Sequence, residues 1–210
     1  MTTMRKEKCK CAMCGAENEY NVIMSTNTFG SPDLDLRPPE MQRSTMSLWV
    51  QECNQCGYVS AEIADKTKIA PEFLKSEEYV SCSGIKFKSK LAARFYKYYL
   101  LNNSGNKNKE KAFFAVLHAA WACDDADDYD NANKCRTIAL SLHPTLPQDE
   151  NFRVMKMDLL RRSGQFEALS KEYSSVEFSQ DILNQIAKFQ LRKAAEGDRS
   201  CYTVANAVEE

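Results

Sequence analysis

Two cysteine pairs of the same spacing are the residues in this chain best suited to carry chemistry. Cys11 and Cys14 form one Cys-x-x-Cys-Gly sequence, and Cys53 and Cys56 form another. A turn of this kind directs two sulfurs towards one ion, and its glycine permits the positive φ that tightens the turn. Two such turns supply four thiolates, the ligand set of a closed tetrahedral zinc site. We therefore predict a structural Zn²⁺ bound by these four cysteines.

An iron site and a redox role are the alternatives for these sulfurs, since a single Cys-x-x-Cys can form a thioredoxin-like pair. A catalytic zinc would need a water in place of one ligand, and no His-Glu-x-x-His or His-x-Glu sequence is present to build such a site. Cys9 is too close to Cys11 for a regular turn, so we interpret it as a free thiol, with substitution for Cys11 as the alternative. Lys8 and Lys10 are expected to offset part of the thiolate charge.

The segment between the pairs is longer than a compact ribbon needs. Residues 15–52 separate them, whereas a compact zinc ribbon has about 15–20 residues there. Residues 21–24, 48–51 and 59–63 are rich in strand-forming side chains and predict the strands of the ribbon. The surplus is residues 31–44, here called the 31–44 loop, whose three prolines fit neither a helix nor a strand. We expect it to leave the ribbon as an excursion whose base is held by the metal.

The 31–44 loop carries charges of both signs. Asp33, Asp35, Arg37 and Arg43 can pair with one another and so tie the loop down. The alternative is a rigid loop that presents these four side chains to a binding partner. The acids of the loop could also form a polar catalytic site, but paired acids in a proline-rich loop are weak evidence, and we do not expect an enzyme.

The second half of the chain has the pattern of a helical domain. From about residue 85, apolar residues recur at helical spacing, and turn sequences at 102–106, 124–130, 143–147 and 163–164 separate the stripes. The stripes contain Leu91, Phe95 and Tyr98/Tyr99; Phe113, Val116, Leu117, Ala120 and Trp121; Ile138 and Leu142; Phe152, Met155 and Leu159; and Ile182, Ile186 and Phe189. Short breaks between helices predict antiparallel neighbours.

A repeat signature lies within this half. Tyr129-x-x-Ala132-x-x-x-Arg136-x-x-Ala139-Leu140-x-x-x-Pro144 has the spacing of the second helix of a tetratricopeptide repeat, in which small alanines let paired helices approach. Residues 164–169 are similar to the turn of a following unit. An ordinary helical bundle is the alternative.

These patterns predict an α+β fold. Residues 1–75 are expected to form a small β zinc ribbon with the inserted loop, and residues 76–195 an antiparallel, tetratricopeptide-like helical domain. Residues 196–210 are polar, and we expect a tail.

Residues 86–111 combine basic and aromatic side chains. The basic residues are Lys86, Lys88, Lys90, Arg94, Lys97, Lys107, Lys109 and Lys111, and the aromatic ones are Phe87, Phe95, Tyr96, Tyr98 and Tyr99. We interpret them as a helix with an aromatic core face and a lysine solvent face. The alternative is a nucleic-acid surface with phosphate contacts and stacking platforms. Further along, His118 is expected to be packed beside an apolar stripe, and Cys123 and Cys135 to be buried thiols facing each other across a helix pair.

Both halves together resemble a family of uncharacterised bacterial proteins with an N-terminal zinc ribbon and C-terminal tetratricopeptide-like helices. The residues that carry the resemblance are Cys-x-x-Cys-Gly at 11–15, Pro-Asp-Leu-Asp-Leu-Arg-Pro at 32–38, Arg43-Ser44, Trp-Val-Gln-Glu-Cys-x-x-Cys-Gly-Tyr at 49–58, and Asp-Leu-Leu-Arg-Arg-Ser-Gly-Gln-Phe at 158–166. The resemblance implies zinc binding at the four paired cysteines and a cytoplasmic setting, and it implies no established activity.

Composition narrows the class of partner. The formal net charge is −1, so no global field attracts the chain to nucleic acid or to an anionic membrane. Nine cysteines, an odd number without a secretion signal, argue against a disulfide framework. We expect a cytoplasmic, zinc-stabilised binding or adaptor protein that recognises a protein or peptide, with nucleic-acid binding through residues 86–111 as the alternative.

Overall fold

The computed structural model describes residues 1–105 and 108–208 and confirms the α+β fold, with short antiparallel strands first and helices after them. The strands are β1 (Thr3–Lys10), β2 (Glu17–Ser25), β3 (Thr28–Phe29), β4 (Glu40–Met41), β5 (Gln51–Glu52) and β6 (Val59–Ser60). The α-helices are α1 (Glu77–Val80), α2 (Lys90–Leu100), α3 (Lys109–Asp124), α4 (Tyr129–Leu142), α5 (Glu150–Arg162), α6 (Phe166–Tyr173), α7 (Asp181–Ala195) and α8 (Val204–Val208). Short 3-10 helices span Arg43–Leu48 (η1), Pro71–Lys75 (η2) and His143–Thr145 (η4), and a π-helical turn spans Leu101–Gly105 (η3).

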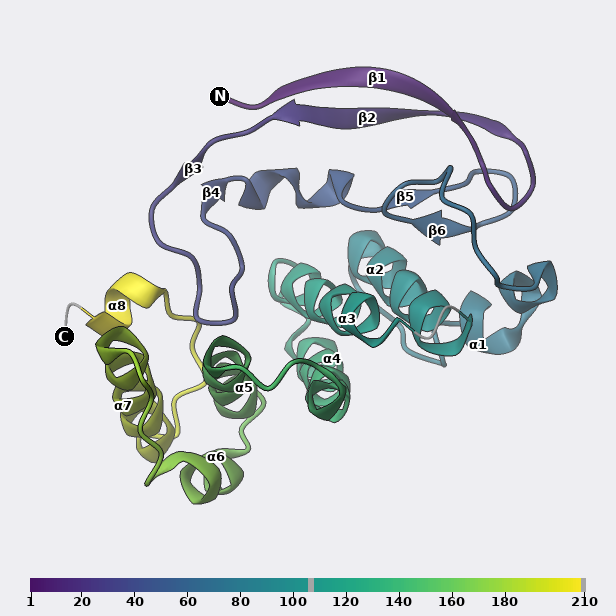
Figure 1. The fold of residues 1–210 in the computed structure, drawn as a ribbon. Coiled ribbons are helices and arrows are strands. Elements are labelled where there is room, and N and C mark those ends of the chain that lie inside the picture. The colour runs from purple at the N-terminus through teal and green to yellow at the C-terminus, as the bar shows by residue number, and fades with distance from the viewer. Residues whose placement is uncertain (106–107, 209–210) are drawn as a thin grey trace.

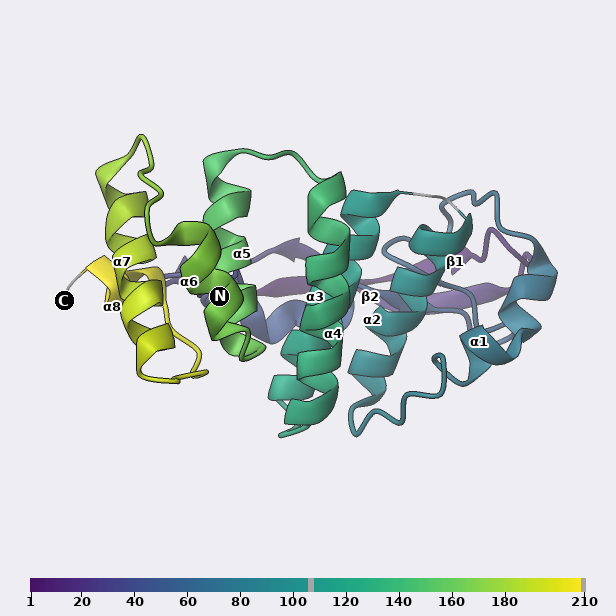
Figure 2. The same cartoon turned by 90° about the horizontal axis from the view of Figure 1, so that it is seen from below.

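The strands form one layer and the helices another. Figures 1 and 2 show the strands lying along one side of the helical array, with α4 and α6 on the opposite side of that array. Within the described residues, the named strands pair as β1 with β2, β3 with β4 and β5 with β6, all antiparallel. The layer is therefore three small ribbons, each too small to be stable without the helices or an ion.

The long β1–β2 hairpin was not expected over its whole length. Strand β1 alternates Lys and Glu and is largely exposed on both faces, so it lacks the apolar alternation from which strands are predicted. The expected strand at 48–51 is wrong for its first three residues: η1 ends at Leu48, and the Trp49 indole donates to the Thr45 hydroxyl one turn back, at 2.9 Å. The expected strand at 59–63 ends at Ser60 because the chain then turns to the first cysteine pair, where Ile63 accepts from the Ala12 amide at 3.0 Å.

Several of the helices begin at side-chain caps. Ser89, Asn108 and Asp149 precede α2, α3 and α5, and each side-chain oxygen accepts from the amide three residues on. Helix α5 ends before Gly164, whose φ of 78° closes the turn as expected. Consecutive helices pack as neighbours, and α5 also packs on α7, the helix after next. None of the helices in the described part of the chain is long and apolar enough to span a membrane.

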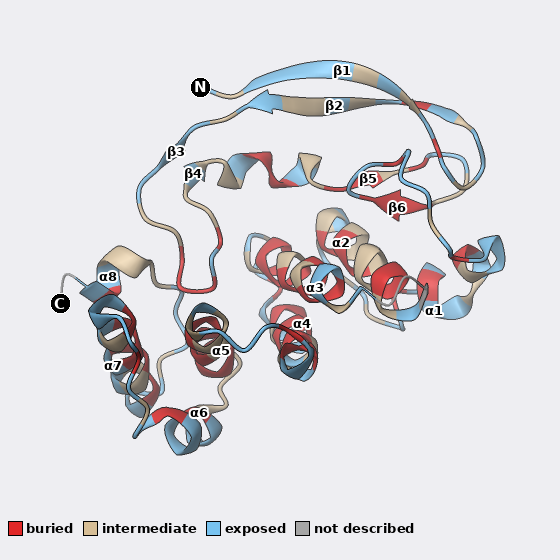
Figure 3. Cartoon of the chain, in the orientation of Figure 1, coloured by how far each residue is buried: buried red, intermediate tan, exposed pale blue. Residues whose placement is uncertain are grey.

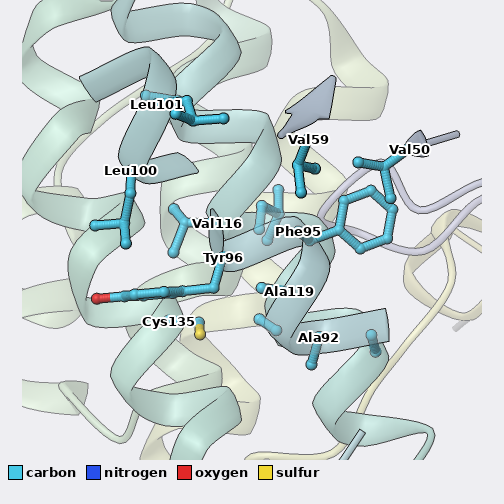
Figure 4. Packing of buried hydrophobic residues seen from close by; sticks show 14 of the residues in the cluster. Val50, Val59, Ala92, Phe95, Tyr96, Leu100, Leu101, Val116, Ala119 and Cys135 are labelled. Carbon is cyan, nitrogen blue, oxygen red and sulfur yellow. The ribbon is translucent and has the colours of Figure 1, made fainter. Parts of the chain in front are cut away.

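Two apolar clusters hold the molecule together. The larger joins α2, α3 and α4 to the cysteine region, and Figure 4 shows Val50 and Val59 from the strand layer lying beside the Phe95 ring of α2. The smaller joins α5, α6, α7 and α8 and includes Leu34 of the 31–44 loop. Apolar packing thus crosses residue 75, and the division of the chain at that position stays a prediction.

Residues 196–208 do not extend as a tail. The Leu34 amide donates to the Tyr202 carbonyl and the Val204 amide to the Pro32 carbonyl, each at 2.9 Å, so the segment pairs with the 31–44 loop before α8 packs on α7. The physical reason is that the loop offers unpaired backbone groups, which a buried segment must satisfy. Figure 3 shows the tip of this loop buried against the helices.

Candidate metal centre

The four predicted cysteine ligands meet at one point. Their sulfurs all lie within 4.8 Å of one another. The Cys11 and Cys56 sulfurs are 3.7 Å apart, as are those of Cys14 and Cys53. Sulfurs about 2.3 Å from a central ion at the corners of a tetrahedron stand about 3.8 Å apart. The cluster therefore has the size of a tetrahedral metal site that uses all four sulfurs.

Both turns have the same backbone geometry. Gly15 donates to the Cys11 carbonyl at 2.8 Å, and Gly57 donates to the Cys53 carbonyl at 2.9 Å. Both glycines have positive φ, 75° and 70°, where a side chain would be strained. The repeated geometry follows from the repeated Cys-x-x-Cys-Gly sequence and brings two sulfurs from each turn to the same ion.

Backbone amides point at the sulfurs. Burial raises the pKa of the Cys11 thiol, and hydrogen bonds from the amides of Cys14 and Met13 offset only part of that rise. Burial also opposes ionisation of Cys53, yet amides of Cys56 and Gln55 help bring its pKa to about 7. Fixed N–H dipoles around the sulfurs favour the thiolate form that a metal requires.

Asn18 links the two turns and was missed by sequence reasoning. This buried side chain donates to the Cys53 sulfur at 3.6 Å and accepts from the Asn54 amide at 3.1 Å. Such contacts orient metal ligands. No motif marks this asparagine; only its place in β2 opposite Cys9 brings it to the cluster.

The helical half also supports the second turn. Tyr79 of α1 is buried and donates from its hydroxyl to the Gly57 carbonyl at 2.6 Å. Burial raises the pKa of this phenol far above its usual range, so the hydroxyl keeps the proton that it donates. The metal centre is therefore braced by a residue outside the strand layer.

Cys9 lies outside the four-sulfur cluster, as the free-thiol interpretation requires. Burial and the neighbouring carboxylates of Glu7 and Glu62 raise the pKa of its thiol. Lys8 reaches Glu17 at 3.8 Å with an exposed side chain. No contact joins Lys8 or Lys10 to the sulfurs, so their expected role in offsetting thiolate charge stays a prediction.

Comparison with known proteins gave no match. No protein-family model, curated protein or solved structure matches this chain. Of what the resemblance implies, the four-cysteine cluster beside N-terminal strands and the helical C-terminal region are present. The family itself is not shown.

The charged residues of the 31–44 loop lie where loop and helices meet. Arg43 donates to Asp33 at 2.6 Å and to the Pro38 carbonyl at 2.9 Å, so one of the expected internal ion pairs is present. Asp35 and Arg37 pair outside the loop instead. Because Asp33, Asp35 and Arg37 are buried, a partner that bound them would have to displace these contacts; their role in partner binding stays a prediction.

Asp35 connects the loop to two helices. Its Oδ2 atom accepts from the Trp121 indole of α3 at 2.7 Å and from Arg162 of α5 at 3.2 Å, and the residue is fully buried. Arg37 donates to Asp125, just after α3, at 2.6 Å. Sequence patterns could not reveal these pairs, because the partners are far apart along the chain and their charges are ordinary for surface residues.

The basic-aromatic segment adopts the arrangement expected of a core helix. Phe95 and Tyr96 are buried. Arg94 and Lys97 pair with Glu52 of β5, at 3.3 Å and 3.0 Å, and so join α2 to the strand layer. Lys107 lies outside the described residues. The buried Phe95 and Tyr96 rings cannot serve as stacking platforms for bases, whereas Phe87, Tyr98 and Tyr99 are half-buried, and nucleic-acid binding by this segment stays a prediction.

His118 is packed among aromatic rings. Its ring centroid lies 5.2 Å from those of Trp49 and Phe95 and 4.8 Å from that of Trp121. Burial lowers its pKa to about 4; nearby Asp35 raises that pKa, and nearby Arg37 lowers it. The histidine is therefore neutral at physiological pH and takes part in packing, as expected.

Cys123 and Cys135 are both fully buried, on α3 and α4. A hydrogen bond with Cys123 and burial raise the pKa of the Cys135 thiol far above its usual range. These are inert thiols within a helix pair, as their positions in the sequence predicted.

Proposed function

We propose that this protein is a zinc-stabilised binding or adaptor protein that recognises a protein or peptide partner. The observation that carries the proposal is the closed four-sulfur cluster. All four sulfurs stand at ligand spacing around one point, which suits a structural Zn²⁺ and leaves no position for water or substrate. The ion would then have the role of holding the two cysteine turns of the strand layer together.

The helical half supports the second part of the proposal. Its helices already hold one non-helical segment in cis, the buried turn at the tip of the 31–44 loop, through Asp35 and Leu34. An open hollow of about 580 Å³ lies between the end of α6 and α7, with Glu177, Asn184 and Lys188 in its lining. Helical arrays of this kind commonly bind peptides along such surfaces.

Affinity capture followed by titration tests the proposal. The zinc-loaded protein is immobilised, a retained protein is identified from a lysate of the source organism, and that protein is purified and titrated. We expect saturable binding that Lys188→Glu weakens, whereas Lys171→Glu, the same change on the exposed side of α6, does not. Saturable binding to nucleic acid alone, weakening steeply as salt rises, would favour the alternative function instead. Absence of any saturable partner would count against the proposal.

A further inference from the structure

A second hollow, of about 480 Å³, lies between the start of α4, the end of α5 and the segment that follows α7. Its lining consists of Asp124, Tyr129, Asn133, Arg136, Arg162, Arg199, Ser200 and Cys201. Three arginines and one acid face a common space. None of the metal ligands contributes to this lining, so the hollow is separate from the metal centre.

Two of these arginines are buried and hold unused donors. The side chains of Arg136 and Arg162 are only 2% and 8% exposed. Arg136 forms a two-point pair with Asp124, and Arg162 donates to Asp124 at 2.8 Å and to Asp35 at 3.2 Å. Each guanidinium has five N–H donors, more than these bonds use, and within the described part of the chain the fully buried Nε atoms of both find no partner. Buried cations with spare donors favour an added acceptor.

Arg199 supplies a third cation at the rim. Its guanidinium lies over the Phe166 ring, 5.7 Å from the centroid, and occupies the space that a Cβ at Gly164 would need. No carboxylate in the described part of the chain pairs with it. The side chain is thus placed by packing on the α5–α6 turn, and no acid among residues 1–105 and 108–208 forms an ion pair with it.

The balance of charge in the hollow is positive. Asp124 is the one carboxylate of the lining, and both its oxygens already accept from the buried arginines. Asp35 lies behind Arg162, so the lining itself holds three arginines and one acid. Desolvation by the surrounding protein and the nearby carboxylates of Asp35, Asp33 and Asp158 raise the pKa of the Cys201 thiol to about 12, so the thiol adds no negative charge at neutral pH. N–H donors therefore outnumber free acceptors.

We propose that this hollow binds a phosphate-type oxyanion through Arg136, Arg162 and Arg199. A phosphate group offers acceptor oxygens in several directions, which suits guanidinium groups that approach from α4, α5 and the 199–201 segment. The volume of about 480 Å³ exceeds that of the bare ion, so a small organic phosphomonoester fits the space as well. This site is independent of the partner binding proposed above.

Calorimetric titration of the zinc-loaded full chain tests the site. Inorganic phosphate, phenyl phosphate and acetate are titrated separately at one fixed ionic strength. We expect phosphate to bind with a dissociation constant of about 1 mM or lower, phenyl phosphate to bind at least as tightly, and acetate to bind more weakly. Arg199→Gln is expected to weaken phosphate binding about fivefold without unfolding the chain, because this side chain is exposed.

Arg192→Gln is the matched control. Arg192 is also exposed and also lies over a ring, that of Phe189, at 5.4 Å, so this variant removes the same charge from another place. The proposal is overturned if phosphate does not bind, if both variants weaken binding equally, or if Arg199→Gln has no effect. If acetate bound as tightly as phosphate, the proposed preference for phosphate-type oxyanions would be overturned. The buried arginines are left unchanged, so no outcome depends on a variant that fails to fold.

Discussion

The two halves of this molecule are held together by different means. The helical half is stabilised by many small contributions, since two clusters of buried apolar side chains run through its helices. The strand layer has three separate two-stranded ribbons; it shares in the larger cluster through Val50, Val59 and Ile63, but its two cysteine turns meet through four sulfurs. The contrast teaches that a half stabilised by many apolar contacts can lose one of them and stay folded, whereas an arrangement centred on a few polar atoms cannot.

Removal of the metal should have the largest effect on stability. It should affect the strand layer far more than the helical half. Structural zinc contributes on the order of 10 kcal/mol to the folding of small metal-bound units, and the two cysteine turns of the strand layer converge on the four-sulfur cluster. We expect a chelator to abolish hydrogen-exchange protection of residues 11–63 while most helical circular dichroism remains. Metal analysis by mass spectrometry should find one zinc per chain in the untreated protein.

Cys53→Ser should reproduce the effect of the chelator, because Cys53 is buried within the four-sulfur cluster. Cys9→Ser is the matched control, since Cys9 is a neighbouring thiol outside that cluster, and it should keep the metal. A folded, metal-free wild-type protein with intact protection of residues 11–63 would contradict the central role given to the four sulfurs.

Loss of the Asp35 carboxylate should have the next largest effect on the free energy of unfolding. Asp35→Asn leaves Arg162 of α5 without the fully buried one of its two carboxylate partners, and breaking a buried ion pair on one side costs about 3–5 kcal/mol. We expect a loss of about 3 kcal/mol in urea unfolding, together with faster exchange at the tip of the 31–44 loop. This variant tests whether the loop couples the two halves.

Glu172→Gln provides the comparison for Asp35→Asn. Glu172 pairs with Lys156 at 2.6 Å, but its side chain is 46% exposed, so we expect a loss below about 1 kcal/mol. Equal losses in the two variants would show that burial of Asp35 adds nothing, and the loop would then be a passive excursion.

The sequence predicted the parts that depend on local pattern. The Cys-x-x-Cys-Gly turns, the helical stripes and the end of α5 before Gly164 each follow from spacing within a few residues, and each is present. The buried ion pairs were not predictable, because Asp35, Trp121 and Arg162 meet only once the loop is folded onto the helices. Pairs of charged residues far apart along one sequence carry no local signal, so their burial becomes visible only in three dimensions.

The pH dependence of stability should report on the contact between the halves. Burial lowers the pKa of His118 from 6.5 to about 4, so the unfolded chain takes up this proton first as the pH falls. The contribution of His118 is therefore fully present above pH 6.5 and is lost progressively between pH 6.5 and 4, by up to about 3 kcal/mol. Urea unfolding at pH 8 and at pH 5 measures this change.

His118→Gln isolates the contribution of that one ring. Protonation of other groups, the thiols included, affects the wild type and the variant alike, so the difference between their pH dependences belongs to His118. We expect the variant to lose less stability between pH 8 and pH 5 than the wild type does. The same pH dependence in both proteins would show that this histidine is not shielded by Trp49, Phe95 and Trp121.

The smallest expected losses of stability come from variants at the contact between the strand layer and α2, where they distinguish apolar from ionic contacts. Val59 is 1% exposed and packs towards Phe95 (Figure 4), so Val59→Ala should cost about 2 kcal/mol. Glu52, one strand away, binds Arg94 and Lys97 with 30% of its side chain exposed, and Glu52→Gln should cost only about 0.5 kcal/mol. If Glu52→Gln proved the more damaging in urea unfolding, then the strand layer would be held on α2 mainly by charge, and the apolar cluster that crosses residue 75 would have a lesser part in joining the two halves.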